Sequence, residues 1–506
     1  MPQYGFVIDQ RKCIGCHACT VACKAENEVP VGSFRTWVKY VEKGTFPSVK
    51  RHFAVLRCNH CDEAPCVEIC PVTALHKRPD AIVDLDRDAC IGCRACMQAC
   101  PYDALYLNED TGTAEKCHYC AHRTERGLEP ACVVVCPEHA IIAGDVSDPS
   151  TEIAHHIATQ PTQQRRLEKG TKPRVWYTGA LDEALQPGAA LEQSMYMWSD
   201  RAEPPRPVPP GFEPPPDLIA ALDVPHPPSW GWHVWLYLLT KNIAAGAMLV
   251  APLLPFLGRA PDESSLLRLL PEAVALAFLG LTTVLLVIDL GRPERFLYIL
   301  TRPNWNSWLV KGTWILMGFG LLTTLSLALR LFDMPAAADV VRWANVPLAV
   351  FASGYTAFLF AQCKGRDLWL EKGLFWHLIL QALLSGAALP LFLAKAATSE
   401  GIKVPAPVFF TLLAVLNVIW LRFHTRMMHS DPVARRAHAQ LRATGAPGLT
   451  VLLFYGAALC ALLPGLITTA QLDSVWLSTA AAIFALGGLT LYERAFIKVG
   501  QEIPNS

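Results

Sequence analysis

Apolar residues follow two different patterns along the 506-residue chain. Up to about residue 145 they form only short runs, such as Phe6–Ile8 and Ala81–Leu85, whereas from Trp230 onward they form long runs separated by polar loops. A helix needs about 20 mainly apolar residues to cross a bilayer. Eight runs meet this length, over residues 231–257, 271–290, 308–331, 342–362, 373–395, 405–423, 448–470 and 474–493. Eight consecutive runs are improbable in a soluble protein, so the pattern predicts an all-α bundle of eight transmembrane helices behind a domain outside the membrane.

A proline-rich stretch separates the two regions. Eight of the thirteen residues from Pro204 to Pro216 are proline, which is typical of a stiff, extended linker. We therefore predict four segments. They are an N-terminal domain over residues 1–145, its polar C-terminal extension over 146–202, the linker over 203–229 and the membrane domain over 230–495.

The overall composition supports a membrane part and excludes a nucleic-acid binder. Hydrophobic residues make up 52% of the chain and charged residues 17%, below the roughly 25% charge of an average soluble protein. Lys plus Arg and Asp plus Glu number 44 each, so no net positive field would attract phosphate groups. We expect no nucleic-acid partner.

Sixteen of the eighteen cysteines lie between Cys13 and Cys136, in four motifs. The first and third read C-x2-C-x2-C-x3-C, the second reads C-x2-C-x4-C-x3-C and the fourth reads C-x2-C-x11-C-x3-C. The members are Cys13, Cys16, Cys19 and Cys23; Cys58, Cys61, Cys66 and Cys70; Cys90, Cys93, Cys96 and Cys100; and Cys117, Cys120, Cys132 and Cys136.

This spacing has a specific chemical reason. Three thiolates on a tight loop hold three irons of a cubane, and the fourth, three residues further on, ligates the neighbouring cluster. Zinc sites use C-x2-C without the third and fourth cysteines at these positions, and a disulfide framework is typical of small secreted chains. The sixteen cysteines therefore predict four [4Fe–4S] clusters.

The same rule predicts how the motifs share their cysteines. Since motifs work in pairs, the adjacent second and third motifs can pair, which leaves the first and fourth to pair around them. The predicted ligand sets are Cys13, Cys16, Cys19 and Cys136; Cys117, Cys120, Cys132 and Cys23; Cys58, Cys61, Cys66 and Cys100; and Cys90, Cys93, Cys96 and Cys70.

With these motifs in place, two family resemblances emerge. Residues 1–145 resemble the four-cluster ferredoxin subunit of molybdopterin oxidoreductases of the dimethyl sulfoxide and polysulfide reductase type, and all sixteen cysteines fit. The eight-span part resembles the NrfD/polysulfide-reductase membrane anchor in the stretches Asp289–Arg295, Arg302–Trp308 and Ser353–Thr356. The resemblance implies a natural fusion of an α+β bis-ferredoxin-like domain with an all-α eight-helix transmembrane bundle.

The resemblance also implies a function. The chain would be the electron-transfer and anchor subunit of a complex in anaerobic respiration, working between a separate catalytic subunit with a molybdenum or tungsten pterin and the membrane quinone pool (menaquinone or ubiquinone). It would react with quinone and not with the terminal substrate. Three alternatives stay open: the same module in a hydrogenase or multihaem cytochrome complex, a passive tether without a quinone site, and ion pumping coupled to quinone turnover.

Polar residues within the spans suggest a quinone site. His233, Tyr237 and Lys241 fall at i, i+4 and i+8 in the first span, on one helix face and closest to the linker. Ionisable groups within spans are costly and are functional candidates, although an interfacial aromatic or a helix-end charge is the competing explanation. Asp289 follows the second span on the same side, and Tyr355 aligns with a quinone-contacting position of the family. His377 and Glu493 are candidates for a proton path.

The distribution of basic residues predicts the orientation. With eight spans both termini lie on one side, where the loops and tail hold 13 Lys and Arg residues against six on the other. Because cytoplasmic loops are enriched in Lys and Arg, the iron–sulfur domain is predicted in the cytoplasm, next to the inner membrane. The N-terminal residues show no signal-peptide or twin-arginine pattern, which agrees with this orientation.

Overall fold

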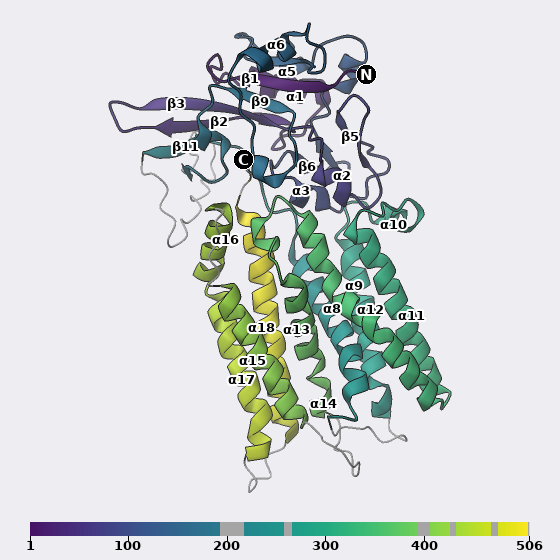
Figure 1. The fold of residues 1–506 in the computed structure, drawn as a ribbon. Coiled ribbons are helices and arrows are strands. Elements are labelled where there is room, and N and C mark those ends of the chain that lie inside the picture. Colours follow the sequence, from purple (N-terminus) through teal and green to yellow (C-terminus); the bar gives the residue numbers. More distant parts are fainter. Residues whose placement is uncertain are drawn as a thin grey trace.

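A computed structural model describes residues 1–192, 217–257, 266–392, 405–425, 432–466, 474–503 and residue 505. A domain of strands and short helices lies on one end of a long helical bundle (Figure 1). The domain of strands and short helices is called the upper domain here; it contains the N-terminus and extends to the end of β11 at Leu222. The C-terminal end of the bundle reaches the boundary between the two parts.

The central sheet of the upper domain has the order β8-β1-β9. Strand β1 (Tyr4–Asp9) pairs antiparallel with β8 (Ile141–Asp145) and parallel with β9 (Val175–Thr178). Consecutive residues of β1 are buried on both faces, as expected for the middle strand of a covered sheet. Since β9 lies in the predicted extension over 146–202, that extension supplies part of the central sheet.

A second sheet contains the strands β10 (Leu191–Glu192), β11 (Leu218–Leu222), β2 (Thr36–Lys43) and β3 (Lys50–Arg57), in that order. Strand β11 lies within residues 203–229, which were predicted to form an extended linker. Residues 203–216 lie outside the described ranges, but residues 218–222 pair antiparallel with β2. The reason is that this short stretch lacks proline and can satisfy the hydrogen-bonding edge of β2.

Two hairpins and five short helices lie within or beside the cysteine motifs. The hairpins are β4 (Leu75–Lys77) with β5 (Val83–Leu85), and β6 (Leu105–Asn108) with β7 (Thr113–Lys116). The helices are α1 (Ala18–Asn27), α2 (Pro65–Ile69), α3 (Ala95–Ala99), α4 (Ala121–Thr124) and α5 (Ala131–Val134). Helix α6 (Glu152–Thr159) covers one face of the central sheet through Ile153.

The described chain has eight helices long and apolar enough to cross a membrane. They are α8 (Trp232–Val250), α9 (Leu270–Ile288), α11 (Trp308–Leu331), α12 (Pro335–Gln362), α13 (Leu374–Gly386) with α14 (Leu389–Phe392), α15 (Ala406–His424), α17 (Ala446–Leu466) and α18 (Ser474–Glu502). Two shorter helices, α10 (Tyr298–Thr301) and α16 (Pro432–Ala443), lie at the end next to the upper domain (Figure 1). The number of spans agrees with the prediction, but α18 extends past residue 495, the predicted end of the membrane domain.

Helix α8 is the centre of the bundle. It packs against α9, α12, α13 and α18 and is the most buried of the eight spans. Its contact with α13 depends on two glycines, because a Cβ atom on Gly246 would lie 2.0 Å from the carbonyl oxygen of Ala382 and one on Gly386 would lie 2.1 Å from that of Gly246. The backbones of the two helices therefore touch, as small residues in membrane interfaces allow.

The two parts of the molecule also meet backbone to backbone. The amides of Gly291 and Arg292 donate to the carbonyls of Gly92 and Ile91, at 3.2 and 3.1 Å. A Cβ atom on Gly92 or on Gly291 would lie 2.3 Å from the carbonyl oxygen of Gly112. The loop Asp289–Arg295, which carried the resemblance to the anchor family, is thus part of the contact with the upper domain.

Candidate electron-transfer and quinone site

Two of the cysteine motifs share one backbone conformation. In the C-I-G-C segments that begin at Cys13 and Cys90, the glycines Gly15 and Gly92 both have φ of 70°. The residues after the second cysteine, His17 and Arg94, both have φ of 59°. This left-handed geometry is costly outside glycine, and it curls each loop around the space where its first three thiols meet.

The fold gathers the sixteen thiols into four groups. Thiols of the first group line one small cavity and thiols of the second line another. In the third and fourth groups, Cys100 lies beside Cys58 and Cys66, and Cys70 lies beside Cys90, Cys93 and Cys96. The first group is Cys13, Cys16, Cys19 and Cys136; the second is Cys23, Cys117, Cys120 and Cys132; the third is Cys58, Cys61, Cys66 and Cys100; the fourth is Cys70, Cys90, Cys93 and Cys96.

The thiols of these groups are free, and most of them are buried. All eighteen cysteines are described and none forms a disulfide. Within the described ranges no three His, Cys, Asp or Glu side chains converge as they would around one metal ion, where Zn–S distances are about 2.3 Å. Burial raises the pKa of the thiols of Cys61, Cys66 and Cys100, because it disfavours the charged thiolate.

The four groups form a series. Cys19 of the first group lies near Cys132 of the second, Cys117 of the second lies near Cys58 of the third, and Cys66 of the third lies near Cys96 of the fourth. Buried cations accompany the second and third groups. Arg57 donates from Nη1 to the sulfur of Cys132 over 3.3 Å, and Lys116 interacts with Cys58. Sequence reasoning missed both residues, although each immediately precedes a motif cysteine.

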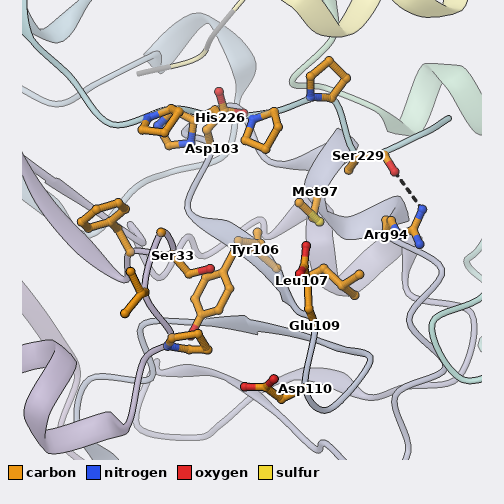
Figure 2. Close-up of a pocket in the computed structure, with 18 of the residues that line it drawn as sticks. Ser33, Arg94, Met97, Asp103, Tyr106, Leu107, Glu109, Asp110, His226 and Ser229 are labelled. Carbon is orange, nitrogen blue, oxygen red and sulfur yellow. Dashed lines mark hydrogen bonds between the residues drawn. The ribbon is translucent and has the colours of Figure 1, made fainter. Parts of the chain in front are cut away.

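The fourth group adjoins the membrane domain. The indole Nε1 of Trp230 donates to the carbonyl of Cys93 at 3.2 Å, Arg295 Nη1 donates to that of Cys90 at 2.9 Å, and Asn304 Nδ2 donates to that of Cys70 at 2.8 Å. A cavity of about 640 Å³ is lined by Arg94, Met97 and Ser229, and Arg94 Nη1 donates to the Ser229 carbonyl at 3.0 Å (Figure 2). The series therefore ends beside Trp230, which precedes α8, and beside the segment between α9 and α11 that contains Arg295 and Asn304.

Two predicted quinone residues lie directly beyond the fourth group. Oδ1 of Asp289 is 3.5 Å from Nη1 of Arg94 and 3.4 Å from Nδ1 of His233. Burial raises the pKa of Asp289 above its ordinary value, although Arg94 and His233 act in the opposite direction. A line of charged groups thus connects the cysteine loop with helix α8.

The other three predicted quinone residues meet further inside the bundle. Lys241 Nζ donates to the carbonyl of Ser353 at 2.7 Å and to Oγ1 of Thr356 at 2.5 Å, and it lies 4.7 Å from the centre of the Tyr355 ring. Tyr237 interacts with both Tyr355 and Thr356. Thr356 was missed as a site residue because a threonine in a span usually bonds its own helix backbone.

The two proton-path candidates belong to one buried polar network. Oε1 of Glu493 accepts from Asn242 Nδ2 at 3.3 Å, and Asn242 also donates to Gln381 at 3.2 Å. Gln381 Nε2 lies 3.4 Å from Nε2 of His377. Asn242 and Gln381 were missed by sequence reasoning, although Asn242 follows Lys241 and Gln381 lies one helical turn after His377.

The network continues toward the upper domain. The ring of His377 packs against Trp420 and Tyr492, and its centre is 6.4 Å from that of His424. His424 forms a buried ion-pair contact with Glu371, which lies in the loop between α12 and α13. A line of buried polar groups therefore runs from Lys241 to the domain boundary.

Matches to family models cover both parts of the chain. Residues 223–503 match the family described as polysulphide reductase, NrfD. Residues 49–146 match a 4Fe-4S dicluster domain, and residues 4–25 match a 4Fe-4S binding domain.

Individual relatives match the N-terminal part. A tetrathionate reductase subunit of Salmonella typhimurium is 46% identical over 187 residues, which is 36% of this chain and 74% of the relative. A polysulfide reductase component of Wolinella succinogenes is 39% identical over 177 residues, 34% of this chain and 93% of the relative. The iron–sulfur subunit ArrB of the arsenate respiratory reductase of a Shewanella species is 35% identical over 221 residues, 34% of this chain and 94% of the relative. The protein belongs to the NrfD polysulphide reductase family and joins that family's multi-pass membrane domain to an iron–sulfur domain of the 4Fe-4S dicluster type.

Proposed function

We propose that this protein is the electron-transfer and membrane-anchor subunit of a respiratory molybdopterin oxidoreductase complex. The observation that carries the proposal is the series of four cysteine groups, which ends at Arg94 beside Asp289 and His233 of the membrane domain. The iron–sulfur relatives named above are components of tetrathionate, polysulfide and arsenate reductases.

Each cysteine group would hold one [4Fe–4S] cluster, four in all, and such clusters accept and release single electrons. Residues of this chain would bind the clusters, orient their ligands and balance their charge. The thiols supply the ligands, the left-handed loops at Gly15 and Gly92 orient them, and the buried cations Arg57 and Lys116 offset their negative charge.

The proposed quinone site is formed by His233, Tyr237, Lys241, Asp289 and Tyr355. Quinone reduction couples two electrons to two protons, so the site needs hydrogen-bond donors for the two carbonyls. His233 is half-buried beside Asp289 and can exchange a proton with it, while Tyr237, Tyr355 and Lys241 supply donors further inside. Glu493 and His377 would connect this site to a proton path through Asn242 and Gln381.

The opposite end of the series is the proposed contact with the catalytic subunit. Cys16 is exposed, and the apolar side chains of Ile14, Val21 and Val134 near the first group are exposed with it. An exposed apolar patch rimmed by polar groups is typical of a protein interface. We infer that a subunit with a molybdenum or tungsten pterin docks here, on the cytoplasmic side that the basic loops favour.

The proposal is tested on the purified full-length protein in membranes. We expect about sixteen iron atoms per chain and reduction of the clusters by a quinol. His233→Ala combined with Tyr355→Phe should slow this reduction by about 100-fold, in the range for loss of acid–base groups, and leave reduction by dithionite unchanged.

The matched control is His155→Ala with Tyr455→Phe, two exposed side chains that line neither the cavity of the first cysteine group nor that of the second. Unchanged quinol reduction in the first double variant would indicate a passive tether. A hydrogenase or a multihaem cytochrome as the co-purifying partner would replace the pterin enzyme in the proposal.

A further inference from the structure

We propose that a basic cavity between the iron–sulfur domain and the membrane helices binds the headgroup of an anionic phospholipid. The cavity has a volume of about 1320 Å³ and lies between residues 163–189 of the upper domain and the helix ends of the anchor. It is separate from the cysteine groups and from the proposed quinone site.

Both parts of the protein contribute cations to this cavity. The upper domain supplies Arg165, Arg166 and Lys169, and the anchor supplies Lys364, Lys372 and Arg436. Three carboxylates line it as well, those of Glu168, Asp182 and Asp367. Asp367 lies 3.2 Å from Arg166 Nη2 and also bonds Lys169, and Glu168 lies 2.5 Å from Arg166 Nε. Six cations against three carboxylates leave the lining with an excess of positive charge, and no carboxylate of the described residues pairs with Lys364 or Lys372.

Two buried guanidinium groups retain donors without a partner. Arg165 is almost fully buried: Nε donates to the Leu185 carbonyl at 3.0 Å and Nη2 donates to the Asn505 carbonyl at 2.7 Å, and its side chain also interacts with the Tyr177 hydroxyl. Its Nη1 atom and that of Arg166 are buried and have no hydrogen-bond partner among the described residues. A buried donor without a partner is costly, and a phosphate oxygen accepts readily from guanidinium.

The position of the cavity at the membrane surface indicates that a lipid headgroup supplies this phosphate. Lys364 comes two residues after the end of α12, and Lys372 comes two residues before the start of α13. Trp376, in the first turn of α13, is 68% exposed, as expected for a tryptophan at the membrane interface. The cations therefore lie at the level of the lipid headgroups, where basic pockets between helices bind anionic lipids.

The rest of the lining suits the remainder of a phospholipid. Leu167, Leu370 and Val433 line the same cavity, and Leu167 is 59% exposed although it belongs to the upper domain. An inorganic anion gains nothing from apolar contacts, whereas the glycerol and first methylenes of a lipid do. A lipid bound here would contact both parts of the protein at once.

The test uses the delipidated full-length protein in a neutral detergent, with phosphatidylglycerol, phosphatidylcholine or inorganic phosphate added separately. We expect phosphatidylglycerol to bind and to raise Tm, and the other two to leave Tm unchanged. Lys364→Gln with Lys372→Gln should weaken phosphatidylglycerol binding by about tenfold or more, since each basic group near a membrane surface contributes measurably.

Arg435→Gln is the matched control, because Arg435 is exposed on α16 and does not line the cavity. Iron content and visible absorbance verify that each variant is folded. The proposal is overturned if phosphatidylcholine or phosphate acts as phosphatidylglycerol does, or if the double variant and Arg435→Gln bind phosphatidylglycerol equally well.

Discussion

The guanidinium of Arg57 and the sulfur of Cys132 are joined by a hydrogen bond of 3.3 Å from Nη1. Arg57 is completely buried, and the centre of the Phe6 ring lies 4.5 Å from its guanidinium carbon. Its Nε and Nη2 atoms have no partner in the described part of the protein. Since Cys19 and Cys117 are also near, Arg57 places a positive charge between the first and second cysteine groups.

Arg57→Gln should lower the midpoint potential of the second cluster. Reduction adds a negative charge, which the guanidinium stabilises, and loss of that charge should cost about 1.4 kcal/mol or more, equivalent to about 60 mV for one electron. A redox titration followed by electron paramagnetic resonance measures the shift. Arg51→Gln, an exposed arginine on the same strand, is the control, and an equal effect of the two substitutions would contradict the assignment.

Gly291→Ala should weaken the contact between the two parts of the molecule. The new methyl group would lie 2.3 Å from the carbonyl of Gly112, and overpacking of this kind costs about 1–3 kcal/mol. We expect a lower Tm and slower quinol-dependent reduction of the clusters. Gly280→Ala is the control, since nothing lies within 4 Å of its added Cβ atom; a Tm unchanged in Gly291→Ala would count against the contact.

The Asp103–Arg366 pair predicts an acid sensitivity of the same boundary. Burial alone would raise the pKa of Asp103, but Arg366, His226 and Asn505 outweigh it and hold the pKa below the ordinary value. A lowered carboxyl pKa stabilises the fold above the unfolded pKa of about 4, and this contribution is lost as the pH falls through the folded value. Asp103→Asn should therefore remove that part of the pH dependence of Tm.

The size of the effect follows from burial of the pair. Breaking a buried ion pair from one side costs about 3–5 kcal/mol, so Tm of Asp103→Asn should fall at neutral pH as well. Asp333→Asn is the control, because Asp333 is exposed in its contact with Arg268. Identical pH profiles for wild type and Asp103→Asn would show that another group is responsible.

Glu493→Gln should slow quinol turnover about tenfold or more without loss of iron, because the amide cannot relay a proton along the buried network. The measurement is quinol-driven reduction of an electron acceptor as a function of pH. Glu294→Gln, an exposed glutamate at the domain boundary, serves for comparison. Equal rates in the two variants would remove Glu493 from the path.

The sequence was most informative where the shape of an iron–sulfur cluster or the thickness of the bilayer constrains the residues. Cysteine spacing is dictated by the shape of a cubane, so the motifs predicted which distant cysteines, such as Cys13 and Cys136, lie together. The length of the apolar runs predicted eight spans because the bilayer sets it. Lys241 could be selected because charged groups are rare inside a membrane, and Tyr355 because it aligns with a quinone-contacting position of the family.

Other features left no local signal. Strand β11 depends on an edge of β2 that lies far away in the sequence, and the five residues 218–222 are too few to predict a strand from their own pattern. Asn242 and Gln381 are neutral, so their pairing depends on the approach of α8 and α13 through Gly246 and Gly386. Arg57 looks like a surface residue in the sequence, and only the fold buries it.

Gln501, at the end of α18, bonds Gln98 of the upper domain and Trp230, and Asn505, just beyond α18, bonds Asp103 of the upper domain. The ribosome adds these residues after the eight spans named above, whereas N-terminal domains fold first during synthesis. The upper domain can therefore fold and take up its clusters before its contact with the end of α18 is made.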